Sequence, residues 1–306
     1  MRYSDGMKIL FASMPADGHF NPIFFCGPYG YGKTHLLNAI AWEAQRLRPD
    51  ARWQSTLECA QPGLSSFEAV TELCPRIADE TSRAFEAGGL PLVFSGDHSC
   101  AVGIWAGISR AIRPEGALGL MWIDAHLDSH TPQTSHTGMI HGMPLAALLG
   151  HGEDALTGCG GEGVKLPAEN VCIVGARSFE PEEQRLLIEL GVRVFYMDEI
   201  RRRGIANVFA DALEIVQSGT AGFGISFDID AIDPLEAPGV GTPAARGIDA
   251  ASMQSVLRGI GSHPRLAGIE VSEYNPARDK EGRTARVVMD VLDAMLALKV
   301  PAWTPA

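Results

Sequence analysis

Short apolar runs alternate with longer amphipathic stretches from one end of the chain to the other. Most of the runs are rich in β-branched or aromatic residues, which is typical of strands buried on both faces. They predict strands at 8–13, 91–95, 118–123, 170–174, 193–196, 222–228 and 267–272. The stretches between them predict helices at 34–47, 66–87, 99–112, 181–190, 205–217, 249–261 and 284–298.

This alternation predicts an α/β fold with a mainly parallel sheet between two layers of helices. Parallel strands bring their carboxyl ends to one edge of the sheet, where α/β enzymes keep their active sites. Ser66 and Asp249 are suitable N-caps, and Gly88-Gly89 is a stop signal for the helix at 66–87. The Gly-rich segment 150–168 reads as a long loop, and such loops often border a site.

Composition and charge narrow the classes of partner. The chain has 306 residues, 46% hydrophobic and 20% charged, as expected of a soluble globular enzyme. A net charge of -12 argues against nucleic acid or an anionic membrane surface as a partner. No segment reads as a signal peptide or a transmembrane helix. Six cysteines without CxxC spacing indicate free thiols, so we expect a cytoplasmic protein.

Three of the predicted strands are followed by acidic or imidazole side chains. In two of these segments the acids alternate with other residues, so on an extended strand they would face one side. This mixture of donors suits Mn²⁺ better than a zinc ion held by thiolates. Two such ions can share a water and lower its pKa. The candidate ligands are His98, Asp124, His126, Asp128, Asp228 and Asp230.

A single aspartate at a strand end is more often a helix cap or a turn residue than a metal ligand. The six candidates are interpreted as metal ligands rather than caps or turn residues, because together they fall at three strand ends of one α/β pattern. Asp233 is different, since it precedes Pro234 and is expected to shape a turn. Asp97 is likewise expected to be structural.

Three motifs resemble the ureohydrolase family of arginases, agmatinases and relatives. They are SGDHS at 95–99, DAHLD at 124–128 and SFDIDAIDPLEAPGVGTP at 226–243. The resemblance covers about residues 53–306, is closest to bacterial arginases, and implies the three-layer α/β/α fold shared by arginases and deacetylases. It implies a C–N hydrolase that cleaves a guanidino substrate to urea and an amine, with L-arginine, yielding L-ornithine, as the first candidate. Agmatinase, guanidinobutyrase and formimidoylglutamase activities are the alternatives.

The resemblance also implies roles for individual residues. One Mn²⁺ would be held by His98, Asp124, Asp128 and Asp228. The second would be held by Asp124, His126, Asp228 and Asp230, with Asp124 and Asp228 bridging. The residues expected to act in catalysis are Asp128, which would pass a proton to the leaving amine, His141, which would shuttle protons, and Glu273, which would hold the guanidinium. The residues expected to bind the rest of the substrate are His130, Thr137, Met139, Glu180 and Thr242. Family members are commonly trimers or hexamers, which implies a homo-oligomer.

The chain departs from arginases in the loop that binds the amino-acid head group. Arginases usually carry Asn where this chain has His130 and Met139, and Met139 cannot donate a hydrogen bond to a carboxylate. Thr137 replaces a common Ser and keeps the hydroxyl. Ser95 stands where the family has Gly. These changes weaken the case for arginine, but not the case for guanidine hydrolysis.

The N-terminal segment belongs to a different pattern. GPYGYGKT at 27–34 fits the phosphate-binding P-loop, and residues 23–52 resemble the Walker A region of bacterial replication-initiator ATPases. Residues 7–22 resemble the start of nucleotide-sugar glycosyltransferases. A P-loop ATPase also needs a Walker B acid, and the acid-tipped strands already belong to the metal motifs. We therefore expect one domain over 1–306, with an atypical structural segment at 1–52 in which the strand at 8–13 and the helix at 34–47 form a first βα unit. A P-loop nucleotide-binding protein is the alternative from another class.

Overall fold

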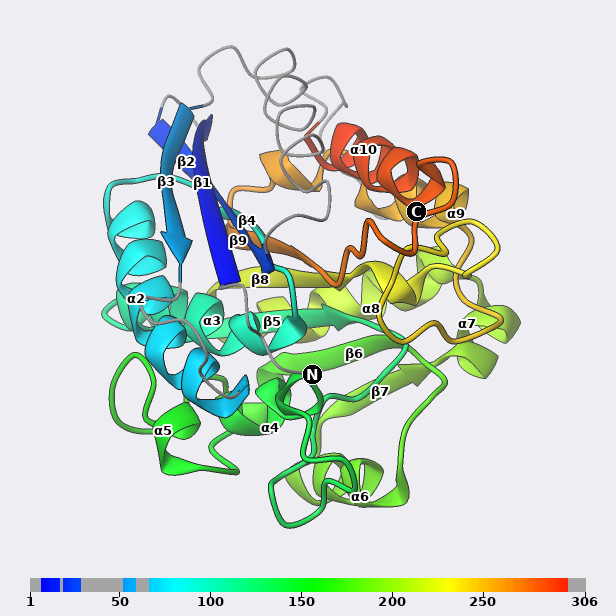
Figure 1. Ribbon diagram of the computed structural model, residues 1–306, viewed down its shortest axis with the longest axis horizontal. Helices are drawn as coiled ribbons and strands as arrows, with labels where there is room; N and C mark the ends of the chain where they lie inside the picture. Colours follow the sequence, from blue (N-terminus) through cyan, green and yellow to red (C-terminus); the bar gives the residue numbers. More distant parts are fainter. Residues whose placement is uncertain (1–6, 17–18, 29–51, 59–65, 297–306) are drawn as a thin grey trace.

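A nine-stranded sheet runs through the computed structural model of the chain (Figure 1). The structure describes residues 7–16, 19–28, 52–58 and 66–296. The strands lie in the order β3-β1-β2-β4-β9-β8-β5-β6-β7. Their bounds are β1 Met7–Ala16, β2 His19–Pro28, β3 Arg52–Glu58, β4 Leu92–Phe94, β5 Ala117–Ile123, β6 Val171–Ala176, β7 Arg193–Tyr196, β8 Thr220–Asp228 and β9 Leu266–Ser272.

The sheet is parallel from β2 to β7, and it becomes antiparallel where β1 pairs with β2 and β3. The predicted strand at 8–13 is therefore present within β1, but it belongs to an antiparallel edge. β2 and β3 were not predicted, and Pro22 inside β2 weakens its strand signal. The predicted helix at 34–47 and most of the P-loop motif lie outside the described residues.

Helices cover both faces of the sheet, which confirms the three-layer α/β/α architecture. One hydrophobic core packs α2 to α6 against the sheet, and a second packs α7 to α10 against the opposite face. The bounds on the first face are α2 Ser66–Glu86, α3 Ala101–Ile112, α4 Pro144–Leu148, α5 Asp154–Thr157 and α6 Pro181–Leu190. Those on the second face are α7 Met197–Arg203, α8 Ile205–Gln217, α9 Ala250–Leu257 and α10 Arg283–Leu296.

The predicted helix signals agree with the observed ends. α2 ends at Glu86, and Gly88 follows with a φ of 80°, a left-handed conformation that favours glycine. The side chain of Asp249 accepts a hydrogen bond from the backbone N–H of Ser252 at the start of α9. α9 is shorter than predicted and ends at Leu257, before the left-handed Gly259.

The segment 150–168 was predicted to be a long Gly-rich loop of a kind that often borders a site, but it contains a short helix and lies outside the pocket lining. It contains α5 and folds around Lys165, whose Nζ donates to the carbonyls of Thr157 at 2.7 Å and Gly163 at 2.6 Å. None of its residues lines the pocket described below. The segment therefore has a structural role, because Lys165 satisfies backbone carbonyls that the loop would otherwise leave unpaired.

The predictions of free cysteines and of no transmembrane helix can be compared with the described residues. Cys74, Cys100, Cys159 and Cys172 are buried free thiols. Burial raises the pKa of Cys159 to about 11, so this thiol is protonated at neutral pH. Among the helices that the structure describes, none is long and apolar enough to span a bilayer.

Candidate metal centre and active site

A pocket with a cavity volume of about 130 Å³ opens at the edge of the sheet where β4, β5 and β8 end. Every predicted catalytic, substrate-binding and metal-ligating residue lines it, except Asp124, which is fully buried beside it. The predicted residues in its lining are His98, His126, Asp128, His130, Thr137, Met139, His141, Glu180, Asp228, Asp230, Thr242 and Glu273. Ser135, His136, Gly142 and Glu183 also line it, and the sequence had assigned none of them a role.

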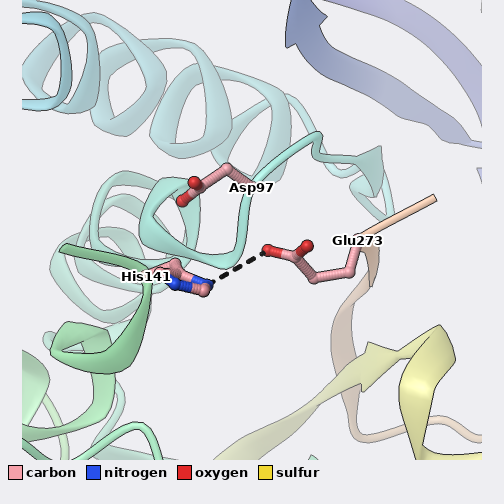
Figure 2. Close-up of side chains that lie close together, drawn as sticks. All are labelled: Asp97, His141 and Glu273. Carbon is pink, nitrogen blue, oxygen red and sulfur yellow. Dashed lines mark ion pairs between the residues drawn. The ribbon is translucent and has the colours of Figure 1, made fainter. Parts of the chain in front are cut away.

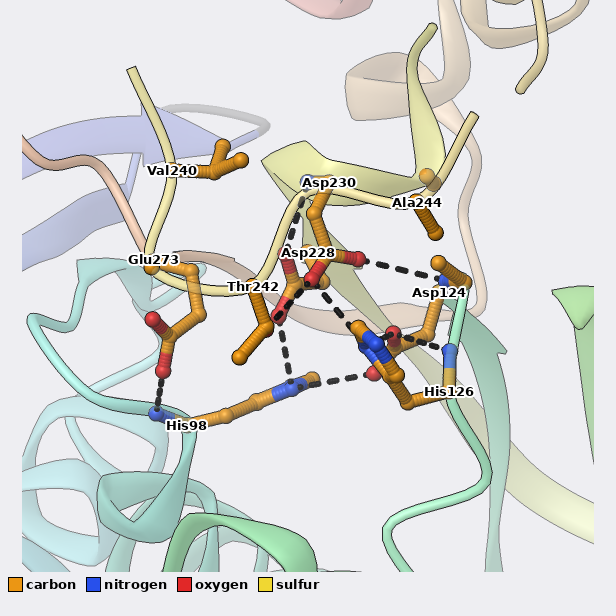
Figure 3. Close-up of polar contacts among 12 residues, drawn as sticks. His98, Asp124, His126, Asp228, Asp230, Val240, Thr242, Ala244 and Glu273 are labelled. Atoms are coloured by element: carbon orange, nitrogen blue, oxygen red, sulfur yellow. Dashed lines mark hydrogen bonds and ion pairs between the residues drawn. The ribbon is translucent and has the colours of Figure 1, made fainter. Parts of the chain in front are cut away.

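The first candidate metal group surrounds His98 (Figure 3). Its Nδ1 lies 3.1 Å from Oδ2 of Asp128 and 3.2 Å from Oδ2 of both Asp124 and Asp228. His98 is only 1% exposed, yet this nitrogen has no hydrogen bond of acceptable geometry. A buried nitrogen that lacks a partner and faces three carboxylate oxygens fits a cation-binding position.

The second candidate group surrounds His126. Its Nδ1 lies 3.1 Å from Oδ2 of Asp230 and 3.4 Å from Oδ1 of Asp124. Asp124 therefore offers one carboxylate oxygen to each group, as a bridging ligand would. Asp228 contributes Oδ2 to the His98 group, while its Oδ1 accepts a hydrogen bond from the backbone N–H of Asp230 at 2.7 Å.

The local backbone differs from the extended geometry that the alternating pattern predicted. β5 ends at Ile123, so the acids of the DAHLD motif lie in the loop that follows. Asp128 adopts a φ of 47°, which an L-residue rarely does. Asp230 lies in a 3₁₀ turn after β8. The prediction of alternate side chains on one strand face was wrong, because turns rather than the pleat bring these carboxylates together.

The charge of the cluster also favours cations. Burial raises the pKa of Asp128 to about 8 and raises the pKa of Asp228 well above its usual range. Burial lowers the pKa of His126, but Asp230 and Asp124 outweigh this and raise it to about 12. Without an ion, the buried carboxylates must share protons with the imidazoles. The four carboxylates would instead be balanced by two divalent cations, so this donor set fits a two-metal site.

Glu273 and His141 line the pocket, and Figure 2 shows their side chains pointing toward each other. Oε1 of Glu273 accepts a hydrogen bond from the backbone N–H of His98 at 2.9 Å, and it lies 3.9 Å from Nδ1 of His141. Burial, together with the charge of nearby Asp97, raises the pKa of Glu273 to about 8. Its φ of 67° is a second strained backbone conformation at this site.

Two other acids near the pocket behave as the sequence predicted. Asp97 accepts a hydrogen bond from the backbone N–H of Ser99 at 2.9 Å and caps the short helical turn that carries His98. Asp233 accepts from the backbone N–H groups of Leu235 and Gly247, each at 2.9 Å. Both acids therefore fix loops next to the candidate ligands, which agrees with the structural roles predicted for them.

His130 contacts two acids that also line the pocket. Its Nε2 lies 3.2 Å from Oε2 of Glu180 and 3.6 Å from Oε2 of Glu183. Glu183 also accepts from the backbone N–H of Glu180 in a capping box at the start of α6. Glu183 was not predicted to line the site, although a glutamate three residues after an N-cap, with Pro181 at the first helical position, is a helix-start signal.

The remaining predicted residues lie along the rim. Thr242 Oγ1 donates to Oδ2 of Asp230 at 3.3 Å and so reaches the second metal group. Met139 is 51% exposed, and its Sδ lies 3.3 Å from Nε2 of His141. Thr137 accepts a hydrogen bond from the backbone N–H of Met139, which leaves its hydroxyl proton free to donate.

The N-terminal part of the chain matches a known protein family. A family model described as "Bacterial DnaA ATPAse domain" matches residues 6–57. This agrees with the predicted resemblance of residues 23–52 to a replication-initiator ATPase. The proposed likeness of 7–22 to glycosyltransferases stays a prediction.

The rest of the chain matches one family. The model described as "Arginase family" covers residues 33–297. An arginase of Brevibacillus brevis is 40% identical over 234 residues, 76% of this chain and 78% of that protein, and an arginase of Bacillus caldovelox is 35% identical over 237 residues, 78% of each. The crystal structure of arginase from Bacillus cereus superposes with a TM-score of 0.73 at 34% identity, covering 77% of this chain and 81% of that one. The chain therefore belongs to the arginase family.

Proposed function

We propose that this protein is a manganese-dependent hydrolase that cleaves a guanidino substrate to urea and an amine, with L-arginine as the first candidate and L-ornithine as the amine product. The carrying observation is the pair of imidazole–carboxylate groups that share Asp124 at the floor of the pocket. Relatives at 31–40% identity that are named arginase support the same chemistry.

Two Mn²⁺ ions are the proposed cofactors. Carboxylate and imidazole donors without a thiolate favour Mn²⁺, and the described free cysteines do not line the pocket. When bound, the ions supply a water whose pKa is lowered toward neutrality. The proposed ligands are His98, Asp124, His126, Asp128, Asp228 and Asp230.

The protein's own groups would position the substrate and move protons. Glu273 offers a buried carboxylate that a guanidinium group can pair with by charge-assisted hydrogen bonds. His141 lies 3.9 Å from Glu273 and is the more exposed of the two, so it can carry protons to and from solvent. Asp128 lines the same pocket and would deliver a proton to the leaving amine.

A second candidate substrate is a guanidino acid that lacks an α-ammonium group. The ammonium of arginine would be expected to bind Glu180, but His130 already lies 3.2 Å from that carboxylate. Ser135 and Thr137 each accept a backbone N–H and so have hydroxyl protons free to donate to a carboxylate. The hydroxyls of Ser135 and Thr137 can therefore donate hydrogen bonds to a substrate carboxylate. His130, in contrast, competes with a substrate ammonium group for Glu180.

We also propose that the whole chain acts as one domain in a cytoplasmic homo-oligomer, a trimer or a hexamer, with a small guanidino molecule and no nucleic acid or membrane as its partner. The pairing of Ile23 on β2 with Leu92 on β4 supports a single domain, because it joins the N-terminal strands to the core sheet. Buried free thiols are typical of a reducing compartment.

Metal removal tests the proposed function. Dialysis against a chelator should abolish urea release from the guanidino substrate, and added Mn²⁺ should restore it. Urea release that persists at full rate in metal-free protein would contradict the proposal.

A further inference from the structure

Glu270 is a buried carboxylate that the proposed reaction does not use. It lies on β9 and is 0% exposed. Its Oε1 accepts a hydrogen bond from Oγ of Ser95 at 2.7 Å, and its Oε2 accepts from Nε1 of Trp105 and Oγ of Ser226, each at 2.8 Å. Among residues 66–296, no Lys or Arg forms an ion pair with it. Burying a carboxylate among neutral hydrogen-bond donors costs folding free energy, because the charge loses its hydration without gaining a counter-ion. The position of Glu270 therefore needs a physical explanation.

Ser226 links this carboxylate to the first metal group. It is paired with Glu270 in the register of the parallel strands β8 and β9, and its Oγ lies 2.9 Å from Nε2 of His98. A serine hydroxyl has one proton, and a carboxylate can only accept. Ser226 therefore gives its proton to Glu270 and accepts from the Nε2–H of His98. This assignment leaves the lone pair of Nδ1 facing the three aspartate oxygens.

Trp122 and Ser226 together fix the orientation of the His98 imidazole ring. His98 stacks on Trp122 with ring centroids 4.1 Å apart and an angle of 17° between the planes. Nε1 of Trp122 donates to Oδ2 of Asp124 at 2.8 Å. The ring is thus held by stacking on one face and by the Ser226 hydroxyl at one edge. Rotation away from the cluster would break both contacts.

We propose that Glu270 is a positioning residue that acts through Ser226 to hold His98 in the tautomer and orientation that bind a metal ion. The inference rests on the metal site of the proposed function. A carboxylate that orients a metal-binding imidazole through its other nitrogen also makes that imidazole a stronger ligand. Ser95, which stands where the family has glycine, supplies one of the hydrogen bonds that keep this carboxylate in place.

Two substitutions test the inference. Glu270→Gln keeps the shape and an acceptor for Trp105 but removes the charge, and Ser226→Ala removes only the link. Metal-free protein is titrated with Mn²⁺, and affinity and stoichiometry are measured by calorimetry. In each variant we expect one of the two ions to bind about 10- to 100-fold more weakly. The electron paramagnetic resonance spectrum at limiting Mn²⁺ should change from that of a coupled pair to that of an isolated ion.

Ser272→Ala is the matched control. Ser272 is as buried as Ser226, lies on the same strand as Glu270, and its hydroxyl has no hydrogen-bond partner within the described residues. It should bind both ions as the wild type does. Unchanged affinity for both ions in Ser226→Ala and Glu270→Gln would overturn the inference, as would an equal weakening of both ions accompanied by a lower melting temperature of the metal-free protein. If Glu270→Gln does not fold, Ser226→Ala decides alone. A wild-type protein that binds no Mn²⁺ would instead refute the proposed function.

Discussion

The imidazole of His130 lies 3.2 Å from the carboxylate of Glu180, and both residues line the pocket that the candidate metal ligands also line. The imidazole is also 3.6 Å from Glu183. In both contacts the same nitrogen, Nε2 of His130, faces the carboxylates, and Glu180 is the acid proposed to bind a substrate ammonium. The pocket therefore combines the candidate metal ligands with a histidine that already contacts the acid proposed to bind the substrate.

Replacing His130 tests whether this residue sets the preference of the enzyme between guanidino substrates with and without an α-ammonium group. His130→Asn should raise kcat/KM for L-arginine relative to 4-guanidinobutyrate by about 10-fold, because Glu180 becomes free to pair with the α-ammonium group. His136→Asn is the control, since His136 lines the same pocket with its ring centroid 6.3 Å from that of His130. Equal ratios in the wild type and in His130→Asn would show that His130 does not set specificity.

Loss of a metal ligand should abolish turnover. Asp230→Ala is expected to lower kcat by more than about 100-fold, because its Oδ2 is the oxygen nearest to Nδ1 of His126. Metal content measured on the same sample should fall with activity. Asp249→Ala removes a helix cap far along the chain from the ligands, so it should cost about 1 kcal/mol of stability and leave kcat unchanged. Near-normal turnover in Asp230→Ala would refute its assignment.

Glu183 should make stability depend on pH. Burial raises the pKa of Glu183 to about 7, whereas the pKa of a glutamate in the unfolded chain is about 4.5. The folded state therefore binds more protons at Glu183 than the unfolded state does between these values, so the contribution of Glu183 to stability is fully present below about pH 4.5 and is lost as pH rises toward about 7. In Glu183→Gln this part of the slope should disappear from melting curves recorded across that range.

Glu189→Gln, an exposed substitution on the same helix, should leave the slope as in the wild type. A slope that is identical in Glu183→Gln and the wild type would mean that Glu183 titrates normally in the folded protein.

The packing of Trp105 against β8 leaves no room at Gly224. A Cβ at this position would lie 2.0 Å from the Trp105 ring, so Gly224→Ala should cost at least about 1–3 kcal/mol. Combining it with Trp105→Leu should give a smaller loss than the sum of the two single changes, because the smaller side chain relieves the clash. Chemical denaturation of the three variants checks this, and strict additivity would contradict it.

Much of the parallel core and most of the pocket could be predicted from local sequence. The strands that became β5 and β8 are continuous apolar runs, and their acidic ends mark the site. The turns that gather the acids could not be predicted, because nothing about an aspartate's side chain reports the left-handed backbone of Asp128. The antiparallel edge was missed because strand direction depends on distant partners.

Interactions between remote segments were also hidden. Glu183 is buried against the backbone of Ser129, and Glu270 gathers donors from β8, α3 and the end of β4. In both cases a glutamate in an ordinary sequence context acquires its role only when separate segments meet. Periodicity and motif spacing carry no information about such contacts.

The most direct test of the central claim is urea release by purified, Mn²⁺-loaded protein across L-arginine, 4-guanidinobutyrate, agmatine and formimidoylglutamate, with formamide followed for the last. We predict product from at least one guanidino substrate that carries a carboxylate, and its loss in Asp230→Ala. No urea and no formamide from any of the four would contradict the account.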